Sequence, residues 1–271
     1  MKKTAIVTGA SRGFGRGIAH VLASEGQYKV FATARNKTAL ENLKREVDDL
    51  GCEGEIIPYV LDQNNDSEVS KFSEEVTKGD TKIDLLVNSA YQGLIAMTPH
   101  FGKRFWERPI SVYDDHMNVG VRSSYVMSKL IVPNMIQNNS GLILQISSYG
   151  GFIYFCDVGY GVAHAAMDRL SYDMATELKD ENVSSKFLLR AIIEKKYETD
   201  DQSDSTLYVQ SLIFLVDFTL IIFFSKLEKT PISFNIEIVI SIYGLDITSP
   251  SSSIVMPFFN DGPIKARALI N

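Results

Sequence analysis

The stretch TGASRGFGRG, residues 8–17, decides the fold of this chain. It follows a short apolar run, TAIV at 4–7, and leads into an alanine- and leucine-rich segment with helical spacing. A glycine loop between a first strand and a first helix lets backbone N–H groups approach a phosphate, and the helix N-terminus adds partial positive charge. The stretch therefore predicts a phosphate-binding loop at the first strand–helix junction of an α/β domain.

Short apolar runs alternate with helical patterns as far as about residue 190. We expect strands at 3–8, 28–34, 54–60, 83–88, 141–147 and 184–189, and helices near 14–25, 37–50, 66–79, 111–137 and 158–180. This alternation is typical of a doubly wound parallel sheet with helices on both faces. We expect residues 1–190 to form one domain with the functional residues, and residues 191–271 to be a divergent segment packed on that domain.

The composition excludes several classes of protein. The 271 residues are 45% hydrophobic, which is enough for a full core, and the net charge of −6 comes with no basic stripe for a nucleic-acid partner. Two cysteines, Cys52 and Cys156, are too few for a disulfide framework and lack metal-ligand spacing, so we expect no metal. The first apolar run is strand-length and ends in the glycine loop, unlike a signal peptide, and a cytoplasmic location is expected.

The last third is the least informative part of the sequence. The apolar block 207–224 is marginal for a membrane span, because about 20 apolar residues are needed and Asp217 lies near its middle. A buried or interface helix is the favoured interpretation, and membrane association, at the periphery of an intracellular membrane, is the alternative. The run FNIEIVISI, 234–242, is a candidate for a seventh strand.

The loop and the end of the second strand together indicate a dinucleotide. The spacing T-G-x-x-x-G-x-G is weak evidence alone, and its place at the first strand–helix junction strengthens it. The expected cradle consists of Gly9, Ser11, Arg12, Gly13, Phe14 and Gly15. After the second strand, Ala34 stands where an NAD site has a carboxylate, and Arg35 follows it, so Arg35 and Arg12 favour the 2′-phosphate of NADP(H). The alternative is that both are solvated surface arginines.

Asp62 ends the third expected strand and is a candidate acceptor for the adenine amino group. The alternative is that it caps the next helix, a role for which Asp66 is better placed.

The motifs TGASRGFG, NSAY at 88–91, MNVG at 117–120, QISS at 145–148 and YGVAH at 160–164 follow one another in a familiar order. In this order the chain resembles the short-chain dehydrogenase/reductase (SDR) superfamily. The segments NSAYQG, FWERP, DDHMNVG and GYGVAHAA are similar to the dehydrogenase/reductase SDR family member 1 type. The resemblance spans residues 4 to about 189 and implies a Rossmann-type fold with an NADP cofactor.

The resemblance also implies roles for particular residues. Tyr160 matches the general acid that protonates a carbonyl oxygen as hydride arrives, and Ser147 matches the serine that hydrogen-bonds that oxygen. Asn118 matches the residue that holds a helix kink and a relay water, and Asn88 matches one that steadies the central strand beside the cofactor. A small carbonyl or alcohol substrate and a homo-oligomer are implied in the same way.

Two departures from the family bear on activity. His164 stands where the family has lysine, four residues after Tyr160 and on the same helix face. A histidine, with a reference pKa of about 6.5, carries less charge at pH 7 than a lysine and should make Tyr160 a poorer acid. Where the family has a Pro-Gly turn beside the nicotinamide, this chain has Arg190 and Ala191.

These departures leave three hypotheses open: an active oxidoreductase, a pseudoenzyme that binds nucleotide or a protein partner, and an unstable product whose C-terminal third does not complete the fold.

The segment at 93–115 follows the fourth strand and carries Trp106 with Phe101 and Phe105. Long loops in this position often cover substrates, and these aromatic side chains favour an apolar carbonyl compound. An equally favoured alternative is a packing or dimer surface.

Overall fold

The computed structural model describes residues 2–195 and 208–216 of the chain. Its strands are β1 (Thr4–Thr8), β2 (Lys29–Ala34), β3 (Glu55–Val60), β4 (Leu85–Asn88), β5 (Gly141–Ser148), β6 (Val183–Lys195) and β7 (Tyr208–Val216). Its helices are α1 (Gly13–Ser24), α2 (Lys37–Asp49), α3 (Asp66–Val76), α4 (Gly93–Met97), α5 (Ile110–His116), α6 (Ser123–Gln137) and α7 (Val158–Glu177). Short helical turns are η1 (Thr98–His100), η2 (Phe105–Glu107), η3 (Met117–Arg122) and η4 (Tyr149–Gly151).

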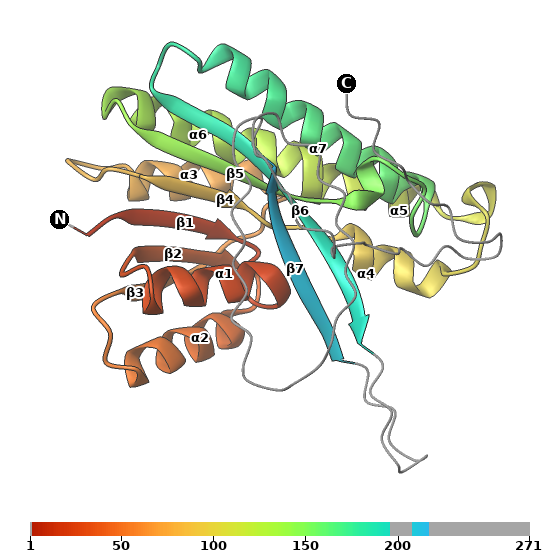
Figure 1. The fold of residues 1–271 in the computed structure, drawn as a ribbon, viewed down its shortest axis with the longest axis horizontal. Coiled ribbons are helices and arrows are strands. Elements are labelled where there is room, and N and C mark those ends of the chain that lie inside the picture. Colours follow the sequence, from red (N-terminus) through yellow and green to blue (C-terminus); the bar gives the residue numbers. More distant parts are fainter. Residues whose placement is uncertain (1, 196–207, 217–271) are drawn as a thin grey trace, which may run out of the picture. The chain divides into compact units, whose positions relative to one another are not determined.

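The strands form one sheet in the order β3-β2-β1-β4-β5-β6-β7 (Figure 1). All neighbours from β3 to β6 pair in parallel, and β7 pairs antiparallel with β6. The strand order reverses direction between β1 and β4, and open α/β sheets bind ligands at the carboxyl ends of the strands at such a point. This architecture confirms the doubly wound α/β fold and places the expected site at that edge.

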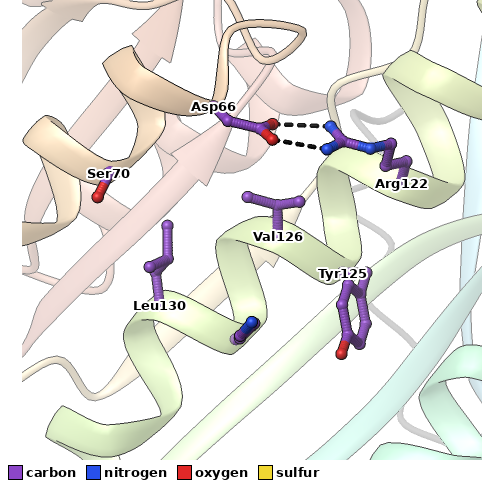
Figure 2. A pocket seen from close by; sticks show the side chains of 7 residues that line it. Asp66, Ser70, Arg122, Tyr125, Val126 and Leu130 are labelled. Atoms are coloured by element: carbon purple, nitrogen blue, oxygen red, sulfur yellow. Dashed lines mark hydrogen bonds and ion pairs between the residues drawn. The ribbon is translucent and has the colours of Figure 1, made fainter.

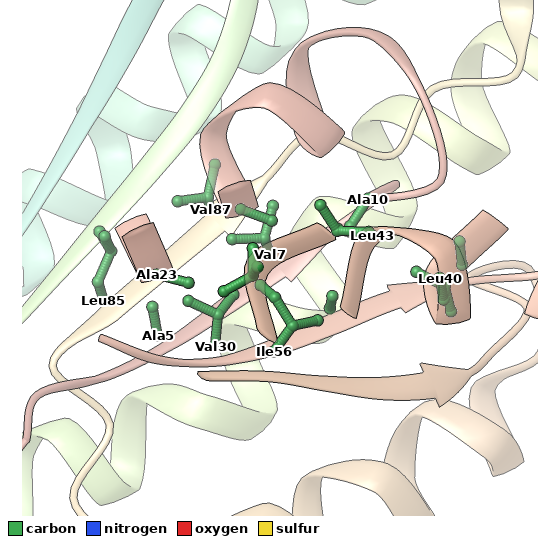
Figure 3. Close-up of a cluster of buried hydrophobic side chains, with 14 residues drawn as sticks. Ala5, Val7, Ala10, Ala23, Val30, Leu40, Leu43, Ile56, Leu85 and Val87 are labelled. Atoms are coloured by element: carbon green, nitrogen blue, oxygen red, sulfur yellow. The ribbon is translucent and has the colours of Figure 1, made fainter. Parts of the chain in front are cut away.

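Each face of the sheet is covered by a hydrophobic core. On one face, Ala5 and Val7 of β1 pack with Ala19 and Ala23 of α1 and with Leu40 and Leu43 of α2 (Figure 3). On the other face, Ile6 packs in a cluster with Phe72 of α3 and Met127 and Ile131 of α6. Because alternate residues of β1 point to opposite faces, both cores converge on the strand that carries the glycine loop.

The helix expected over 111–137 is interrupted. Val119 has φ −104° and ψ 61°, which is outside the helical region, and η3 separates α5 from α6 there. The Val119 carbonyl accepts a hydrogen bond at 3.0 Å from the Gln92 N–H, so a contact from another segment fixes the break.

The cap of α3 also differs from the expectation. The Asn65 side chain accepts hydrogen bonds from the Ser67 and Glu68 N–H groups and is the N-cap. Asp66 is the first residue of the helix instead, so the expectation that Asp62 or Asp66 caps this helix is wrong.

The expectation of a helix at 207–224 is wrong for the described part of this block, because Tyr208–Val216 is the strand β7. A continuous apolar run without periodicity is compatible with either structure, and pairing with β6 selects the strand. The rest of that block and the candidate strand at 234–242 lie outside the described residues. Within the described residues, no helix is long and apolar enough to span a membrane.

The chain divides into two compact units, Met1–Asp217 and Phe218–Asn271, and only the first contains described residues. The boundary expected at residue 190 stays a prediction.

Candidate active site

The glycine loop after β1 is shaped by close backbone contacts. Gly9 has φ +68°, and a Cβ atom there would lie 2.8 Å from the Ala90 Cα. Gly13 has φ +55° and no neighbour within 4 Å of an added Cβ, so this side of the loop is open. Gly15 is buried on the first turn of α1, beneath the Gly9 carbonyl. The loop is thus an open cradle, with the backbone behind Gly9 as its wall.

Two hydrogen-bonded contacts hold this loop to the neighbouring strands. The Thr8 Oγ1 accepts hydrogen bonds of 3.0 Å from both the Ser89 and Ala90 N–H groups, after β4. The Ala10 N–H donates to the Thr33 carbonyl of β2 at 3.0 Å. The loop is therefore fixed from both sides before any ligand binds.

The N-terminus of α1 lacks a side-chain cap. Its N-cap residue is Arg12, whose side chain makes no capping hydrogen bond, and its first turn contains no acidic residue. Ser11 precedes this cap and Phe14 follows it within the first turn. Arg12 and Arg35 are exposed, and neither forms an ion pair with another described residue. The site offers an anion the N-terminus of a helix without a side-chain cap, together with two exposed cations.

Asp62 lies two residues after the end of β3 and is partly buried. Its Oδ1 accepts a 2.9 Å hydrogen bond from the Asn64 N–H, so the carboxylate is positioned within its own turn.

Asn88 is buried at the end of β4, and its Nδ2 donates to the Ser128 Oγ of α6 at 3.0 Å. The side chain joins β4 to α6.

Asn118 lies in η3, directly before the break at Val119. Arg122 at the end of η3 forms a two-pronged ion pair of 2.6 and 2.7 Å with Asp66 of α3, beside a surface hollow between α3 and α6 (Figure 2). This hydrogen-bonded pair lowers the pKa of Asp66 and anchors η3 from its far end.

Ser147 is fully buried at the end of β5, beneath α7. Its hydroxyl faces Asp168 of α7 and by itself would lower the pKa of that carboxyl. The geometry between the two groups is not that of a conventional hydrogen bond. Burial outweighs this effect and raises the pKa of Asp168 to about 6. The neighbouring Ser148 accepts a hydrogen bond from the Gly150 N–H and caps η4.

Tyr160 is fully buried on the first turn of α7, and His164 lies one turn further on. Their ring centroids are 4.3 Å apart, so the residue in the family's lysine position does contact the expected acid. Gly150 lies against the Tyr160 ring, since a Cβ there would come within 2.5 Å of its Cε1. The segment after Ser147 thus packs directly on Tyr160.

The structure also shows a buried polar network that the sequence analysis missed. Tyr91, His116, Asp157 and Arg108 meet beside Tyr160, and the side chains of the last three are at most 7% exposed. Burial alone would raise the pKa of Asp157, but its contacts with His116, with the Tyr160 N–H and with Arg108 outweigh this and lower it. One signal in the sequence could have pointed to Asp157, because an Asp directly before a helix is a common N-cap and Asp157 precedes α7.

The segment after Leu189, where the family has a Pro-Gly turn beside the nicotinamide, departs from the family pattern. β6 continues as a strand through Arg190 and Ala191 to Lys195, where the resemblance implies a Pro-Gly turn. The β6 backbone at these positions pairs with β7 instead.

The segment at 93–115 is not a long irregular loop. It contains α4, η1, η2 and the start of α5, and it exposes Phe101, Phe105 and Trp106, which are 63–69% accessible. Within the described part of the chain, no cluster of side chains could hold a metal ion.

The parallel sheet, the glycine cradle at its switch point and the buried tyrosine define a dinucleotide-binding α/β protein. The family model described as short chain dehydrogenase matches residues 3–203. The chain therefore belongs to the short-chain dehydrogenase family, whose members use a nicotinamide cofactor.

Similar proteins agree with this assignment. The chain is 40% identical over 190 residues to "Dehydrogenase/reductase SDR family member 1" of Mus musculus, and equally to that of Homo sapiens. These matches cover 70% of this chain and 60% of each relative, so the chain spans about 60% of the relatives' length.

Two solved structures illustrate the fold with a cofactor. A metagenomic short-chain oxidoreductase in complex with NADP is 29% identical with a TM-score of 0.61, covering 69% of this chain and 80% of its own. A 7α-hydroxysteroid dehydrogenase complexed with NADH is 28% identical with a TM-score of 0.59, covering 67% of both chains.

Proposed function

We propose that this chain is an NADP(H)-dependent oxidoreductase that reduces the carbonyl group of an apolar small molecule, or oxidises the corresponding alcohol. The observation that carries the proposal is the contact between the rings of Tyr160 and His164 on α7, whose centroids lie 4.3 Å apart. A buried phenol against an imidazole, at the ligand-binding edge of the sheet, has the composition of a general acid site.

The residues present fit the phosphate end of NADP(H). Any side chain at Gly9 would meet the Ala90 backbone, whereas the space beside Gly13 is open, and the N-terminus of α1 has no side-chain cap. Arg12 and Arg35 would bind a 2′-phosphate, and Asp62 would accept from the adenine amino group.

At the reacting end, the bound nicotinamide would supply a hydride. Tyr160 would give its proton to the substrate's carbonyl oxygen, and the Ser147 hydroxyl would donate a hydrogen bond to the same oxygen. Asn118, held at the η3 break, would position a water for the return of a proton, and His164 would supply part of the charge that a lysine provides. The exposed Phe101, Phe105 and Trp106 support an apolar substrate.

Following NADPH absorbance with a panel of ketones, quinones and aldehydes tests this proposal. We expect turnover in the full chain and a loss of at least about 100-fold in Tyr160→Phe, because general acids contribute that much or more. Folded wild-type protein with no rate above background would count against catalysis.

A second candidate function is a nucleotide-binding pseudoenzyme, which His164 and the continuous β6 strand favour. The variant His164→Lys separates the two functions. A large gain in rate with unchanged folding supports an attenuated enzyme, whereas NADPH binding without turnover in both proteins supports the pseudoenzyme.

We also propose a homo-oligomer in the cytoplasm, with the periphery of an intracellular membrane as the alternative location. Exposed apolar side chains on α6 and α7, among them Tyr125, Val162 and Tyr172, support a surface that pairs with a second copy. Light scattering of the full chain and fractionation of cells test these two proposals.

A further inference from the structure

A continuous chain of polar contacts runs beside Tyr160 through four side chains from four segments. The Tyr91 hydroxyl lies 2.5 Å from the His116 Nδ1, and the His116 Nε2 lies 3.4 Å from the Asp157 Oδ2. Arg108 pairs with the same Asp157 oxygen. His116 is completely buried.

The partners of His116 determine which nitrogen carries its proton. The Nε2 faces a carboxylate and therefore holds the hydrogen, so the Nδ1 accepts the hydrogen bond from the Tyr91 hydroxyl. In this order of hydroxyl, imidazole and carboxylate, the imidazole can take the hydroxyl proton while the carboxylate stabilises the cation that forms. Arg108 balances the charge of Asp157 when His116 is neutral.

The fold reserves space for this imidazole. A Cβ at Gly93 would come within 1.9 Å of the His116 Nδ1, and one at Gly159 within 2.7 Å of its Cδ2. Two glycines from different segments therefore enclose the ring, and its orientation toward Tyr91 is fixed by packing as well as by hydrogen bonding.

Tyr91 connects the network to the expected acid. Its ring centroid lies 6.0 Å from that of Tyr160 and 5.0 Å from that of His164. Asp157 is tied to the same place, because its Oδ1 accepts a 2.6 Å hydrogen bond from the Tyr160 N–H. The network therefore ends on the two residues that would carry the reaction.

We propose that Tyr91, held by the His116–Asp157 pair, is a positioning residue that exchanges a proton with Tyr160 during turnover; this inference rests on the proposed function. In the direction of alcohol oxidation, Tyr160 takes the proton of the substrate hydroxyl and passes it to the Tyr91 oxygen, while the Tyr91 proton moves to the Nδ1 of neutral His116. Asp157 faces the imidazolium that forms, and His116 gives this proton up to solvent before the next turnover. Reduction runs the same steps in reverse, and only O–H and N–H bonds change.

The kinetic test uses the full chain with NADPH and whichever carbonyl compound it reduces. We expect Tyr91→Phe to lower kcat about tenfold with KM unchanged, because it removes one hydrogen-bonded hydroxyl and keeps the ring. His116→Gln should lower kcat similarly, and the double variant should fall no further, since both changes break one relay. The control is Tyr28→Phe, the same change directly before β2, at the edge of the sheet opposite the site, and its kcat should equal that of the wild type.

A spectroscopic test is independent of turnover. In ¹⁵N NMR spectra, His116 should show the tautomer with hydrogen on Nε2, and its Nδ1 signal should shift in Tyr91→Phe and stay unchanged in Tyr28→Phe. An unchanged His116 spectrum in Tyr91→Phe would overturn the network.

The two failures are distinguishable. Wild-type turnover with an unaltered kcat in Tyr91→Phe overturns the relay alone, whereas a folded wild type without turnover overturns the proposed function and the relay with it. Should His116→Gln fail to fold, Tyr91→Phe still decides the question.

Discussion

Asp168, a carboxyl buried near Ser147, makes the stability of the fold depend on pH. Burial raises the pKa of this carboxyl from 3.8 to about 6, and the Ser147 hydroxyl offsets only part of that effect. A carboxyl that holds its proton more tightly in the folded state stabilises the fold at low pH. This contribution is complete below about pH 4 and is lost as the pH rises through about 6.

The variant Asp168→Asn removes this titration. Relative to the wild type, it should gain about 1 kcal/mol in the free energy of unfolding between pH 4 and pH 7.5, a value reduced for partial solvent exposure. Urea unfolding at a series of pH values measures the difference. Glu177→Gln, a change at an exposed position of the same helix, is the control, and a pH-independent difference for Asp168→Asn would contradict the prediction.

At the scale of elements, the loop between β1 and α1 sets the shape of the phosphate cradle. Gly9→Ala would place a Cβ against the Ala90 backbone at a positive φ, so the loop must move. We expect a loss of about 1–3 kcal/mol in stability and a large loss of NADPH affinity. Urea unfolding and NADPH fluorescence titration measure the two effects.

Gly17→Ala is the matched control for this loop. Gly17 lies on α1 with no neighbour within 4 Å of an added Cβ and no positive φ. The change should stabilise the helix by about 0.5–1 kcal/mol and leave NADPH affinity unaltered. Equal effects of the two alanines would show that the close contact at Gly9 does not shape the cradle.

The same scale shows how far the sequence predicts this fold. Local periodicity predicted the strands up to residue 190 and most of the helices, because each follows from residues adjacent in the chain, but it did not predict α4. It could not predict the break at Val119, which depends on a hydrogen bond from Gln92, or the strand at 208–216, which depends on pairing with β6.

The site was predictable to a similar extent. Motif order predicted Gly9, Ser147, Tyr160 and His164 as site residues, and in the fold Gly9 follows β1, Ser147 lies near the end of β5 and the other two lie on α7. The Arg108–Asp157 pair joins residues 49 positions apart, and no spacing rule links them to His116 or Tyr91. Buried networks of this kind arise from packing between segments, so only the folded structure reveals them.

At the scale of the whole molecule, the proposed cofactor would lie across the carboxyl ends of the strands. Arg35 follows β2 on one side of the switch point, and Tyr160 lies beside β5 on the other. A ligand that touches both sides binds only the folded state, so it stabilises the sheet as a unit, by about 2.7 kcal/mol at 100 times its Kd. Cofactor preference is therefore measurable as stability before a substrate is known.

Arg35→Ala tests that preference, because the 2′-phosphate is the group that distinguishes NADPH from NADH. Removing one charged hydrogen-bond donor should weaken NADPH binding by about tenfold or more and lower its stabilisation by about 1.4 kcal/mol, while NADH stabilisation stays unchanged. Urea unfolding with each cofactor measures both, and Arg45→Ala, an exposed arginine of α2, should change neither. Equal losses with NADPH and NADH would show that Arg35 does not bind a 2′-phosphate, and stabilisation by neither cofactor in the wild type would show that the cradle after β1 does not hold a nicotinamide dinucleotide.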